Sequence, residues 1–318
     1  MPARRIIAPV AAGLGTVAGI GAGCLAYASL YEVRAFTVRR VEVPILPADA
    51  TPIRVLHISD LHMTPYQQAK QRWVSRLSGL EPDLVINTGD NLADRDAVPY
   101  VTTSLGRLLD IPGVFVWGSN DYFGPKPKNP LRYLKRRQHT PRPAGRQLPW
   151  DQLQQAFTAS GWVELTETRT RLTIRGTEIE FRGTNDGHLE LDRYDQVAGP
   201  AAPEADIAIG VTHAPYQRLL DAMTTDGIDL ITAGHTHGGQ VCIPGYGALV
   251  SNCDLDPRKA KGLSTHSAGG NRSYLHVSAG AGTSPYAPIR FACRPEATLM
   301  TLVARPPGSD SAQPQSLG

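Results

Sequence analysis

The chain of 318 residues is 41% hydrophobic and 19% charged, so it has enough apolar material for a sizeable core and does not have the composition of a disordered protein. Its formal net charge is +3, but the basic stretch at residues 122–150 has eight Lys and Arg residues and no acid, which leaves 24 basic against 29 acidic residues elsewhere. The four cysteines have no CxxC spacing, which argues against a disulfide framework.

The N-terminal segment has the composition of a membrane anchor. Residues 6–30 contain no charged side chain. A helix of that length would be about 37 Å long, which exceeds the roughly 30 Å hydrocarbon core of a bilayer. We therefore predict an uncleaved single-pass anchor, residues 1–31, in the cell membrane; a cleaved signal peptide is the alternative. Because Arg4 and Arg5 precede the span, we expect the rest of the chain to lie outside the cytoplasm.

Strand and helix patterns alternate along the rest of the chain. Strands are predicted at residues 39–43, 54–59, 84–88, 114–117, 206–212, 228–233, 274–279 and 297–303, with short strands within 162–183. Helices are predicted after an N-cap at Thr64, at residues 98–109 and 150–160, and after Pro215. The early strands repeat about every 30 residues, which is typical of βαβ units with parallel strands. The sequence therefore predicts an α/β fold.

These patterns divide the chain into four parts. After the anchor come a juxtamembrane strand and linker at residues 32–51 and one domain at residues 52–303. The basic stretch interrupts this domain as an insertion that could bind anionic lipid headgroups, guide an anionic substrate or form a solvated loop. Residues 304–318, rich in proline, serine and glutamine, are predicted to be a disordered tail.

Side chains that can bind a metal ion follow five of the predicted strands. They are Asp60 and His62, Asp90, Asn120 and Asp121, His213, and the pair His235 and His237. Ligands of α/β sheets bind at the carboxyl ends of the strands, so these groups can converge on one site. The densest segment, residues 234–240, places two histidines, which are common metal ligands, between glycines that allow close approach. Any one of these residues could be explained as part of a turn or as a helix cap, but their occurrence after five strands favours a metal site.

The order of these motifs resembles that of the calcineurin-like metallophosphoesterases. The matching blocks are Asp-x-His at residues 60–62, Gly-Asp at 89–90, a Gly-Asn-His-type turn at 118–121, a single histidine at 213 and Gly-His-x-His at 234–237. The fuller segments at residues 234–240 and 277–284 look like a membrane-associated bacterial branch that includes YkuE-like enzymes and UDP-2,3-diacylglucosamine pyrophosphatases. The resemblance covers residues 40–303 and implies an α/β sandwich of two mixed β-sheets flanked by helices.

The resemblance also implies a binuclear metal centre. Of its ligands, Asp60, His62 and His237 would bind one ion, Asn120, His213 and His235 the other, and Asp90 both. Oxygen and nitrogen ligands without thiolates suit two divalent ions such as Mn²⁺, Fe²⁺, Zn²⁺ or Co²⁺. The implied reaction is hydrolysis of a phosphoester or pyrophosphate bond by a hydroxide that bridges the ions. The catalytic residues would be Asp90, Asn120, Asp121 and His235.

The turn at residues 118–121 departs from the family pattern. The family has Gly-Asn-His followed by an acid, whereas this chain has Gly-Ser-Asn-Asp. Aligned on Gly118, Ser119 replaces the metal-binding asparagine; shifted by one residue, Asn120 keeps that role and Asp121 takes the place of the histidine. An amide oxygen is a better metal ligand than the neutral hydroxyl of a serine, so we prefer the shifted alignment. Without the histidine, we expect a preference for leaving groups that need no protonation, such as those of phosphoanhydrides and aryl esters.

The sequence thus predicts a membrane-anchored phosphoesterase that acts on a phosphorylated small molecule, which we expect to be lipid-linked or to belong to the cell envelope. The alternatives are a broad phosphodiesterase or nuclease with soluble substrates and a degenerate, non-catalytic metal-binding domain. Nucleic acid is not an expected partner, because no RNA-binding signature and no aromatic platform accompany the basic stretch. Residues 185–188 could lie at the edge of the active site, and His57 is expected in the core.

Overall fold

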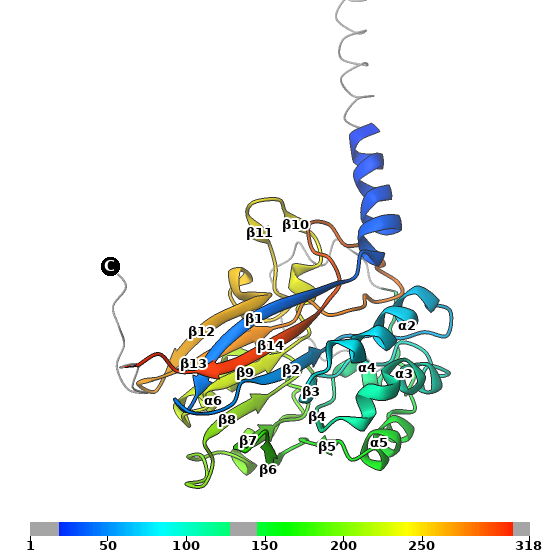
Figure 1. The fold of residues 1–318 in the computed structure, drawn as a ribbon. Helices are drawn as coiled ribbons and strands as arrows, with labels where there is room; N and C mark the ends of the chain where they lie inside the picture. The colour runs from blue at the N-terminus through cyan, green and yellow to red at the C-terminus, as the bar shows by residue number, and fades with distance from the viewer. Residues whose placement is uncertain (1–18, 128–144, 308–318) are drawn as a thin grey trace, which may run out of the picture.

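Two six-stranded mixed sheets form a sandwich (Figure 1) in the computed structural model, which describes residues 19–127 and 145–307. The first sheet consists, in spatial order, of β1 (Thr37–Leu46), β14 (Glu296–Ala304), β2 (Ile53–Ile58), β3 (Leu84–Asn87), β4 (Gly113–Phe115) and β5 (Val163–Glu164). The second consists of β12 (Gly262–Ala268), β13 (Asn271–Val277), β9 (Leu230–Ala233), β8 (Ile207–Val211), β7 (Thr177–Gly183) and β6 (Thr168–Ile174). A separate hairpin pairs β10 (Cys242–Ile243) with β11 (Gly247–Ala248). The predicted α/β fold with two mixed sheets is confirmed.

The hydrophobic core lies between the sheets and under the helices. Aliphatic side chains of both sheets pack against one another, among them Val55 of β2, Ile209 of β8 and Leu230 of β9. Helices α2 (Gln68–Ser75), α3 (Val98–Leu105) and α5 (Trp150–Ala159) pack on the first sheet, and α6 (Gln217–Thr225) packs on the second. Strands β3, β4, β8 and β9 are buried along their full length, as expected for parallel strands covered on both faces.

The strands that were predicted to carry metal ligands run parallel within each sheet. In the first sheet β2 pairs with β3 and β3 with β4, all in parallel. In the second sheet β8 and β9 are parallel neighbours. The carboxyl ends of these five strands can therefore deliver their loops to one edge of the sandwich.

Two helix boundaries differ from the sequence prediction. Helix α2 begins at Gln68, and the predicted N-cap at Thr64 is wrong, because the Thr64 N–H donates to Oε1 of Gln67 and Gln67 is the N-cap. The helix predicted at residues 98–109 is interrupted at Gly106, whose φ is +45°, and continues only as a 3₁₀ turn. Strand β12 and the β10–β11 hairpin were not predicted, since neither has a clear alternation of apolar and polar residues.

The N-terminal segment enters the domain as a helix. Residues 19–26 are α-helical, and a π-helical turn (Tyr27–Tyr31) and a 3₁₀ turn (Glu32–Arg34) connect them to β1. Within residues 19–127 and 145–307, no helix has both the length and the apolar character needed to cross a membrane. The first part of the predicted anchor, residues 128–144 of the basic insertion and the end of the predicted tail lie outside the described residues.

Two buried histidines, His57 of β2 and His276 of β13, meet between the sheets. Their Nδ1 atoms are 2.8 Å apart, and Nε2 of His57 is 2.9 Å from Oγ1 of Thr88. Burial is the main cause that lowers the pKa of His57 well below its usual value and the pKa of His276 to about 4. Both rings are therefore neutral at pH 7, and the expectation that His57 belongs to the core is confirmed.

We predict that acid destabilises the domain in part through this pair. A histidine whose pKa is lower in the folded state takes up its proton on unfolding, so the free energy of unfolding falls as the pH drops from 6.5 toward about 4. For His276 this corresponds to roughly 3 kcal/mol. Urea unfolding of metal-free His276→Leu should therefore depend less on pH than the wild type in this window. At pH 8, where both histidines are neutral in the folded and unfolded states, the difference in free energy of unfolding between the two proteins measures the packing change alone. An unchanged pH dependence in His276→Leu would contradict the prediction.

Candidate metal centre

The loops that leave five strands meet at one edge of the sandwich. Asp60 and His62 follow β2, Asp90 follows β3, Asn120 follows β4, His213 follows β8, and His235 and His237 follow β9. Strands β2 to β4 belong to the first sheet, whereas β8 and β9 belong to the second, so the candidate centre spans both sheets. The structure thus brings the predicted ligands together from segments up to about 180 residues apart, as the parallel topology allows.

One group of donor atoms belongs to Asp60, His62 and His237. All lie within 4.8 Å of one another. Nε2 of His62 is 3.3 Å from Nε2 of His237, and Oδ1 of Asp60 is 3.9 Å from the former and 3.7 Å from the latter. Donors at these separations can surround one transition-metal ion at the usual ligand distances of about 2.0–2.2 Å.

A second group lies beside the first. Asp60, Asp90 and His213 also place their donor atoms within 4.8 Å of one another. Oδ2 of Asp90 is 3.4 Å from Nε2 of His213 and 3.5 Å from Nε2 of His62. The Asp90 carboxylate therefore lies between the two groups.

Asn120 and His235 adjoin the second group. Nδ2 of Asn120 donates to Oδ2 of Asp90 at 2.6 Å, and its backbone N–H donates to Oδ1 at 2.7 Å. The ring of His235 lies 5.2 Å from the ring of His213, and its backbone N–H donates to Asp60. The Asn120 amide thus lies against the Asp90 carboxylate through its NH₂ group, and the role of its oxygen as a metal ligand stays a prediction.

The surroundings of His213 suit a cation. Nδ1 of His213 donates to the carbonyl oxygen of Thr88 at 2.6 Å, whereas the buried Nε2 faces Oδ2 of Asp90. The Nε2 lone pair and the carboxylate repel one another unless a proton or a metal ion lies between them. Burial lowers the pKa of His213, but the charge of Asp90 outweighs burial and raises this pKa well above its usual value. The residues present therefore fit a metal ion at this position.

The other imidazoles are neutral, which is the form that binds metals. Burial lowers the pKa of His62 to about 4. Burial, together with neighbouring imidazoles, lowers the pKa of His235 and of His237 well below the usual value. Burial raises the pKa of Asp90, but the adjacent His213 outweighs it and holds this pKa well below its usual range. An ionised carboxylate among neutral imidazoles is a donor set that suits Mn²⁺, Fe²⁺, Zn²⁺ or Co²⁺.

The backbone of the site is strained. Five of the predicted ligands have φ angles between 40° and 68°, namely Asp60, His62, Asp90, His235 and His237. This left-handed region is uncommon for residues other than glycine and costs on the order of 1–3 kcal/mol each. Glycines leave room for the turns: a Cβ at Gly118 would overlap the Asp90 carboxylate, and one at Gly234 would overlap Ser59. Strain of this kind gathers at functional sites.

Comparison with known proteins identifies the family. A model of the family described as calcineurin-like phosphoesterase matches residues 53–239, which is more than half of the chain and contains all the predicted ligands. The chain belongs to this family. It is therefore a metal-dependent phosphoester hydrolase, and the family typically uses two metal ions.

Individual relatives are similar along most of the chain. The uncharacterized protein YpbG of Bacillus subtilis is 28% identical over 79% of this chain and 81% of its own length. Phosphodiesterase YaeI of Escherichia coli is 26% identical, with 94% of this chain and 98% of YaeI covered. The uncharacterized metallophosphoesterase YkuE of Bacillus subtilis is 23% identical, with 94% and 95% covered. The resemblance seen in the sequence is confirmed for the family, whereas the branch stays a prediction.

In this phosphoesterase both carboxylate oxygens of Asp121 accept hydrogen bonds from backbone N–H groups. Its Oδ2 accepts from the N–H groups of Asp90 and Gly118 at 2.7 and 3.0 Å, and its Oδ1 accepts from those of Asn91 and Leu92 at 2.7 and 3.2 Å. The side chain is fully buried. This geometry does not support the predicted catalytic role of Asp121 in place of the family histidine. It fits a positioning residue that ties the loop after β3 to the turn after β4.

Two buried basic side chains, to which the sequence analysis assigned no role, hold the loops of the phosphoesterase site. Nη2 of Arg290 donates to three carbonyl oxygens of residues 279–282 at 2.7–3.0 Å and lies 3.5 Å from Nδ1 of His237. Nζ of Lys70 donates to the carbonyl oxygens of residues 61 and 62 at 2.5 and 3.3 Å. No local sequence pattern predicts these contacts, because the side chains of Arg290 and Lys70 bind backbone oxygens, which every residue has.

A further imidazole lies at the edge of the site. The ring of His188 is 4.5 Å from the ring of His235, and its Nδ1 is 2.9 Å from the hydroxyl of Tyr216. The fully buried Asp186 accepts the His188 backbone N–H at 3.0 Å. The suggestion that residues 185–188 edge the site therefore agrees with the geometry.

A groove of about 1040 Å³ adjoins the metal-binding loops. Thr64, two residues after His62, belongs to its lining. The exposed rings of Tyr66 and Tyr286 also line it, together with two basic side chains, Arg95 and Arg146, and two acidic ones, Asp94 and Asp96. Aromatic rings beside guanidinium groups suit a substrate with both an apolar and an anionic part.

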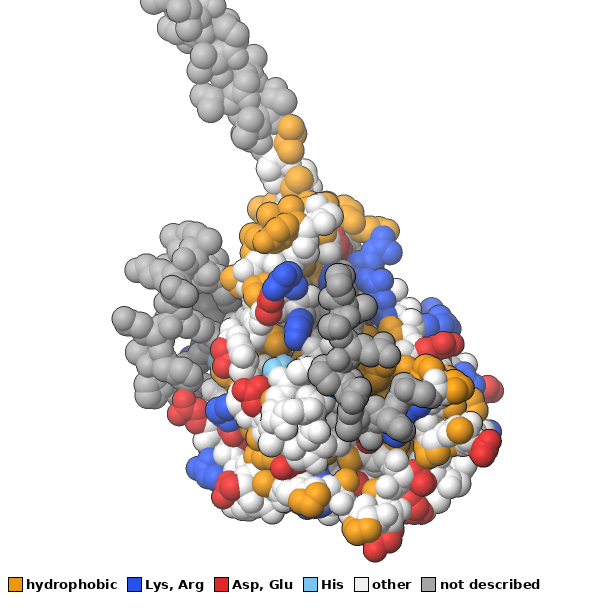
Figure 2. Space-filling view, turned by 90° about the vertical axis from the view of Figure 1, so that its left-hand side faces the viewer, with side chains coloured by type: hydrophobic (Ala, Val, Ile, Leu, Met, Phe, Trp, Pro, Cys, Tyr) orange, Lys and Arg blue, Asp and Glu red, His pale blue; other side chains and the backbone are white. Residues whose placement is uncertain are grey.

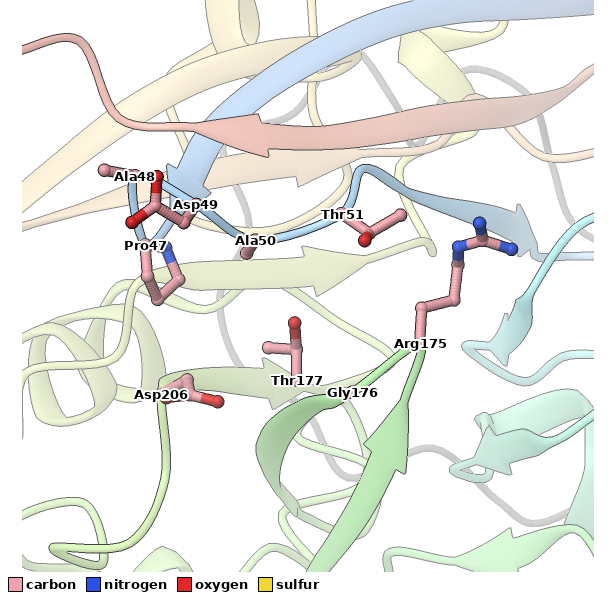
Figure 3. Close-up of a pocket in the computed structure, with 9 residues that line it drawn as sticks. All are labelled: Pro47, Ala48, Asp49, Ala50, Thr51, Arg175, Gly176, Thr177 and Asp206. Carbon is pink, nitrogen blue, oxygen red and sulfur yellow. The ribbon is translucent and has the colours of Figure 1, made fainter.

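A smaller hollow of about 340 Å³ lies at the opposite end of the strands (Figure 3). Here residues 47–51, which precede β2, face the turn between β6 and β7, with Arg175 and Thr177 on one side and Asp206 beside them. None of its lining residues is a histidine. It therefore lacks the donor set found at the carboxyl ends of the strands.

We predict that Asp121→Asn weakens metal binding. The amide replaces one carboxylate oxygen by an NH₂ group that faces backbone donors, so the loop that carries Asp90 loses its fixed position. Mn²⁺ affinity, measured by calorimetric titration, should fall about 10–100-fold, as is usual when a partner that orients a ligand is removed. The exposed Asp110→Asn is the matched control and should bind as the wild type does. Normal Mn²⁺ affinity with lost hydrolysis would instead return Asp121 to a catalytic role.

Proposed function

We propose that this protein is a membrane-anchored phosphoesterase that holds two divalent ions and hydrolyses phosphoester or pyrophosphate bonds in a lipid-linked or cell-envelope compound. The observation that carries the proposal is the place of Asp90, whose Oδ2 lies 3.4 and 3.5 Å from the Nε2 atoms of His213 and His62. A carboxylate between two imidazoles matches two adjacent cation sites. The anchor at residues 6–30 and the outward orientation of the domain belong to this proposal.

The proposed ligands follow the two groups of donor atoms. Asp60, His62 and His237 would hold the first ion, Asn120, His213 and His235 would hold the second, and Asp90 would serve both. When bound, such a pair of ions supplies an activated water and a positive clamp for phosphoryl oxygens. Mn²⁺, Fe²⁺, Zn²⁺ and Co²⁺ all match these donors.

The chain itself orients these donors. The carbonyl oxygen of Thr88 accepts from Nδ1 of His213 and thereby leaves Nε2 of this ring to face the site. The backbone N–H of His235 donates to both oxygens of Asp60 at 3.2 and 3.1 Å, which fixes the plane of that carboxylate. Burial raises the pKa of Asp121 to about 7, but both its oxygens accept backbone N–H groups, so we assign it to orienting the loops and not to protonating a leaving group. We therefore propose a preference for phosphoanhydrides and aryl esters over alkyl phosphomonoesters.

The groove supports an amphipathic substrate. Tyr66 and Tyr286 offer apolar surface, and the guanidinium groups of Arg95 and Arg146 offer donors to phosphate oxygens, beside the acids Asp94 and Asp96 of the same groove. A lipid-linked phosphate has the corresponding apolar and anionic parts. The relative YaeI carries the name phosphodiesterase, which keeps a phosphodiester of a soluble compound as the second candidate substrate.

The first test compares the full-length wild type with Asp90→Asn. We expect two metal ions per wild-type chain and Mn²⁺-dependent hydrolysis of bis(p-nitrophenyl) phosphate. Asp90→Asn should lose at least one ion and about 1000-fold in turnover, because its carboxylate belongs to both groups. Asp110→Asn, which is remote and exposed, should keep both properties. A folded wild type that binds no metal and hydrolyses no substrate would identify a degenerate binding domain.

The second test is a substrate panel of a pyrophosphate, an aryl diester and an alkyl monoester. We expect the first two to be hydrolysed faster, and faster turnover of the alkyl monoester would refute the preference. His188→Asn should be included, because its ring lies beside His235. A selective loss of alkyl ester turnover in this variant would show that His188 serves the leaving group that the turn at residues 118–121 does not.

A further inference from the structure

An apolar surface projects from the domain beside the metal centre. The hairpin surface, as we call it, consists of Val241, Ile243, Tyr246, Leu249 and Val250, on and around β10 and β11. These side chains are between 39% and 73% exposed, with Tyr246 the most exposed of them. Exposed apolar residues gathered on one short hairpin are a mark of an interaction surface.

The hairpin surface is continuous with the N-terminal helix. Val241 forms a parallel bridge with Phe291, and the Cys242 N–H donates to the carbonyl oxygen of Phe291 at 2.8 Å. The ring of Phe291 packs edge-on against Tyr27 at 6.1 Å, and Tyr27 packs against Tyr31 at 5.3 Å. The hairpin and the end of the helix therefore form one apolar surface, and Figure 1 shows both on the same side of the domain.

The charges around this surface suit lipid headgroups. No Asp, Glu, Lys or Arg residue occurs between residues 234 and 253. At its border lie Lys261, whose Nζ is 3.5 Å from the carbonyl oxygen of Ala292, and the exposed Arg34 after the N-terminal helix. Figure 2 shows hydrophobic side chains gathered at the base of the helix, with Lys and Arg side chains nearby. Asp254 and Asp256 follow the surface, and Asp256 is paired with Arg258. An apolar centre with basic residues at part of its border is typical of a surface that enters the interface of a bilayer.

We infer that the hairpin surface inserts into the membrane and sets the metal centre at the lipid surface. The occupant is a bilayer because the same apolar surface includes the end of the N-terminal helix, which belongs to the segment at residues 6–30 that has no charged residue in the sequence. The metal-binding residue His237 precedes Val241 by only four residues, so a hairpin held at the headgroups holds the site near them. The inference extends the proposed function, from which it takes the membrane.

The test measures contact of the hairpin itself with lipid. Full-length Tyr246→Trp is reconstituted into phosphatidylethanolamine and phosphatidylglycerol vesicles with and without brominated acyl chains. Tyr100→Trp, at an exposed tyrosine of α3, is the matched control with the same native tryptophans. We expect brominated lipid to quench the added fluorescence of Tyr246→Trp roughly twofold or more, and that of Tyr100→Trp hardly at all, since bromine quenches only rings within the bilayer interface.

The outcomes separate this inference from the proposed function. If both variants float with the vesicles and neither is quenched, the hairpin does not enter the bilayer, and only this inference is overturned. If the chain does not float with the vesicles, both the inference and the membrane part of the proposed function are overturned. Metal content and hydrolysis of a soluble diester are measured on the same samples, and their loss would count against the metal centre alone.

Discussion

The carboxylate of Asp90 faces an imidazole from each sheet, and the rest of the structure keeps this contact in place. Oδ2 lies 3.5 Å from Nε2 of His62 and 3.4 Å from Nε2 of His213. Buried donors that all offer lone pairs repel one another, and they stay together only if a rigid frame holds them and a cation can enter. The parallel strands supply the frame, and the left-handed loops turn their side chains back toward a common point. The fold thus holds together a group of donor atoms that would be unfavourable without a cation.

The support for this contact comes mainly from side chains that bind backbone. Asp121 accepts four backbone N–H groups, Arg290 donates to three backbone carbonyl oxygens, and Lys70 donates to two. Each ties the loop of one ligand to a different segment of the chain. This arrangement gives the acid of the turn at residues 118–121 a role, because Asp121 orients the loops.

The functional features share one side of the molecule. The metal-binding residues, the groove with its tyrosines and arginines, the N-terminal helix and the hairpin surface all lie on loops at the carboxyl ends of the strands or beside them. An enzyme with a lipid-linked substrate needs this arrangement, because the phosphate of such a substrate stays at the headgroup level. The smaller hollow at the other end of the strands offers no metal donors of this kind.

The candidate ligands could be read from the amino-acid pattern, because each follows a strand at a short, local spacing, as in Asp60–His62 and His235–His237. The α/β class followed from the alternating patterns in the same way. The role of Asp121, the contacts of Arg290, the His57–His276 pair and the apolar surface around Tyr246 became visible only in the folded chain. These features depend on which distant segments meet and on which side chains are left exposed. Such information belongs to the packing of the sheets and not to any local spacing.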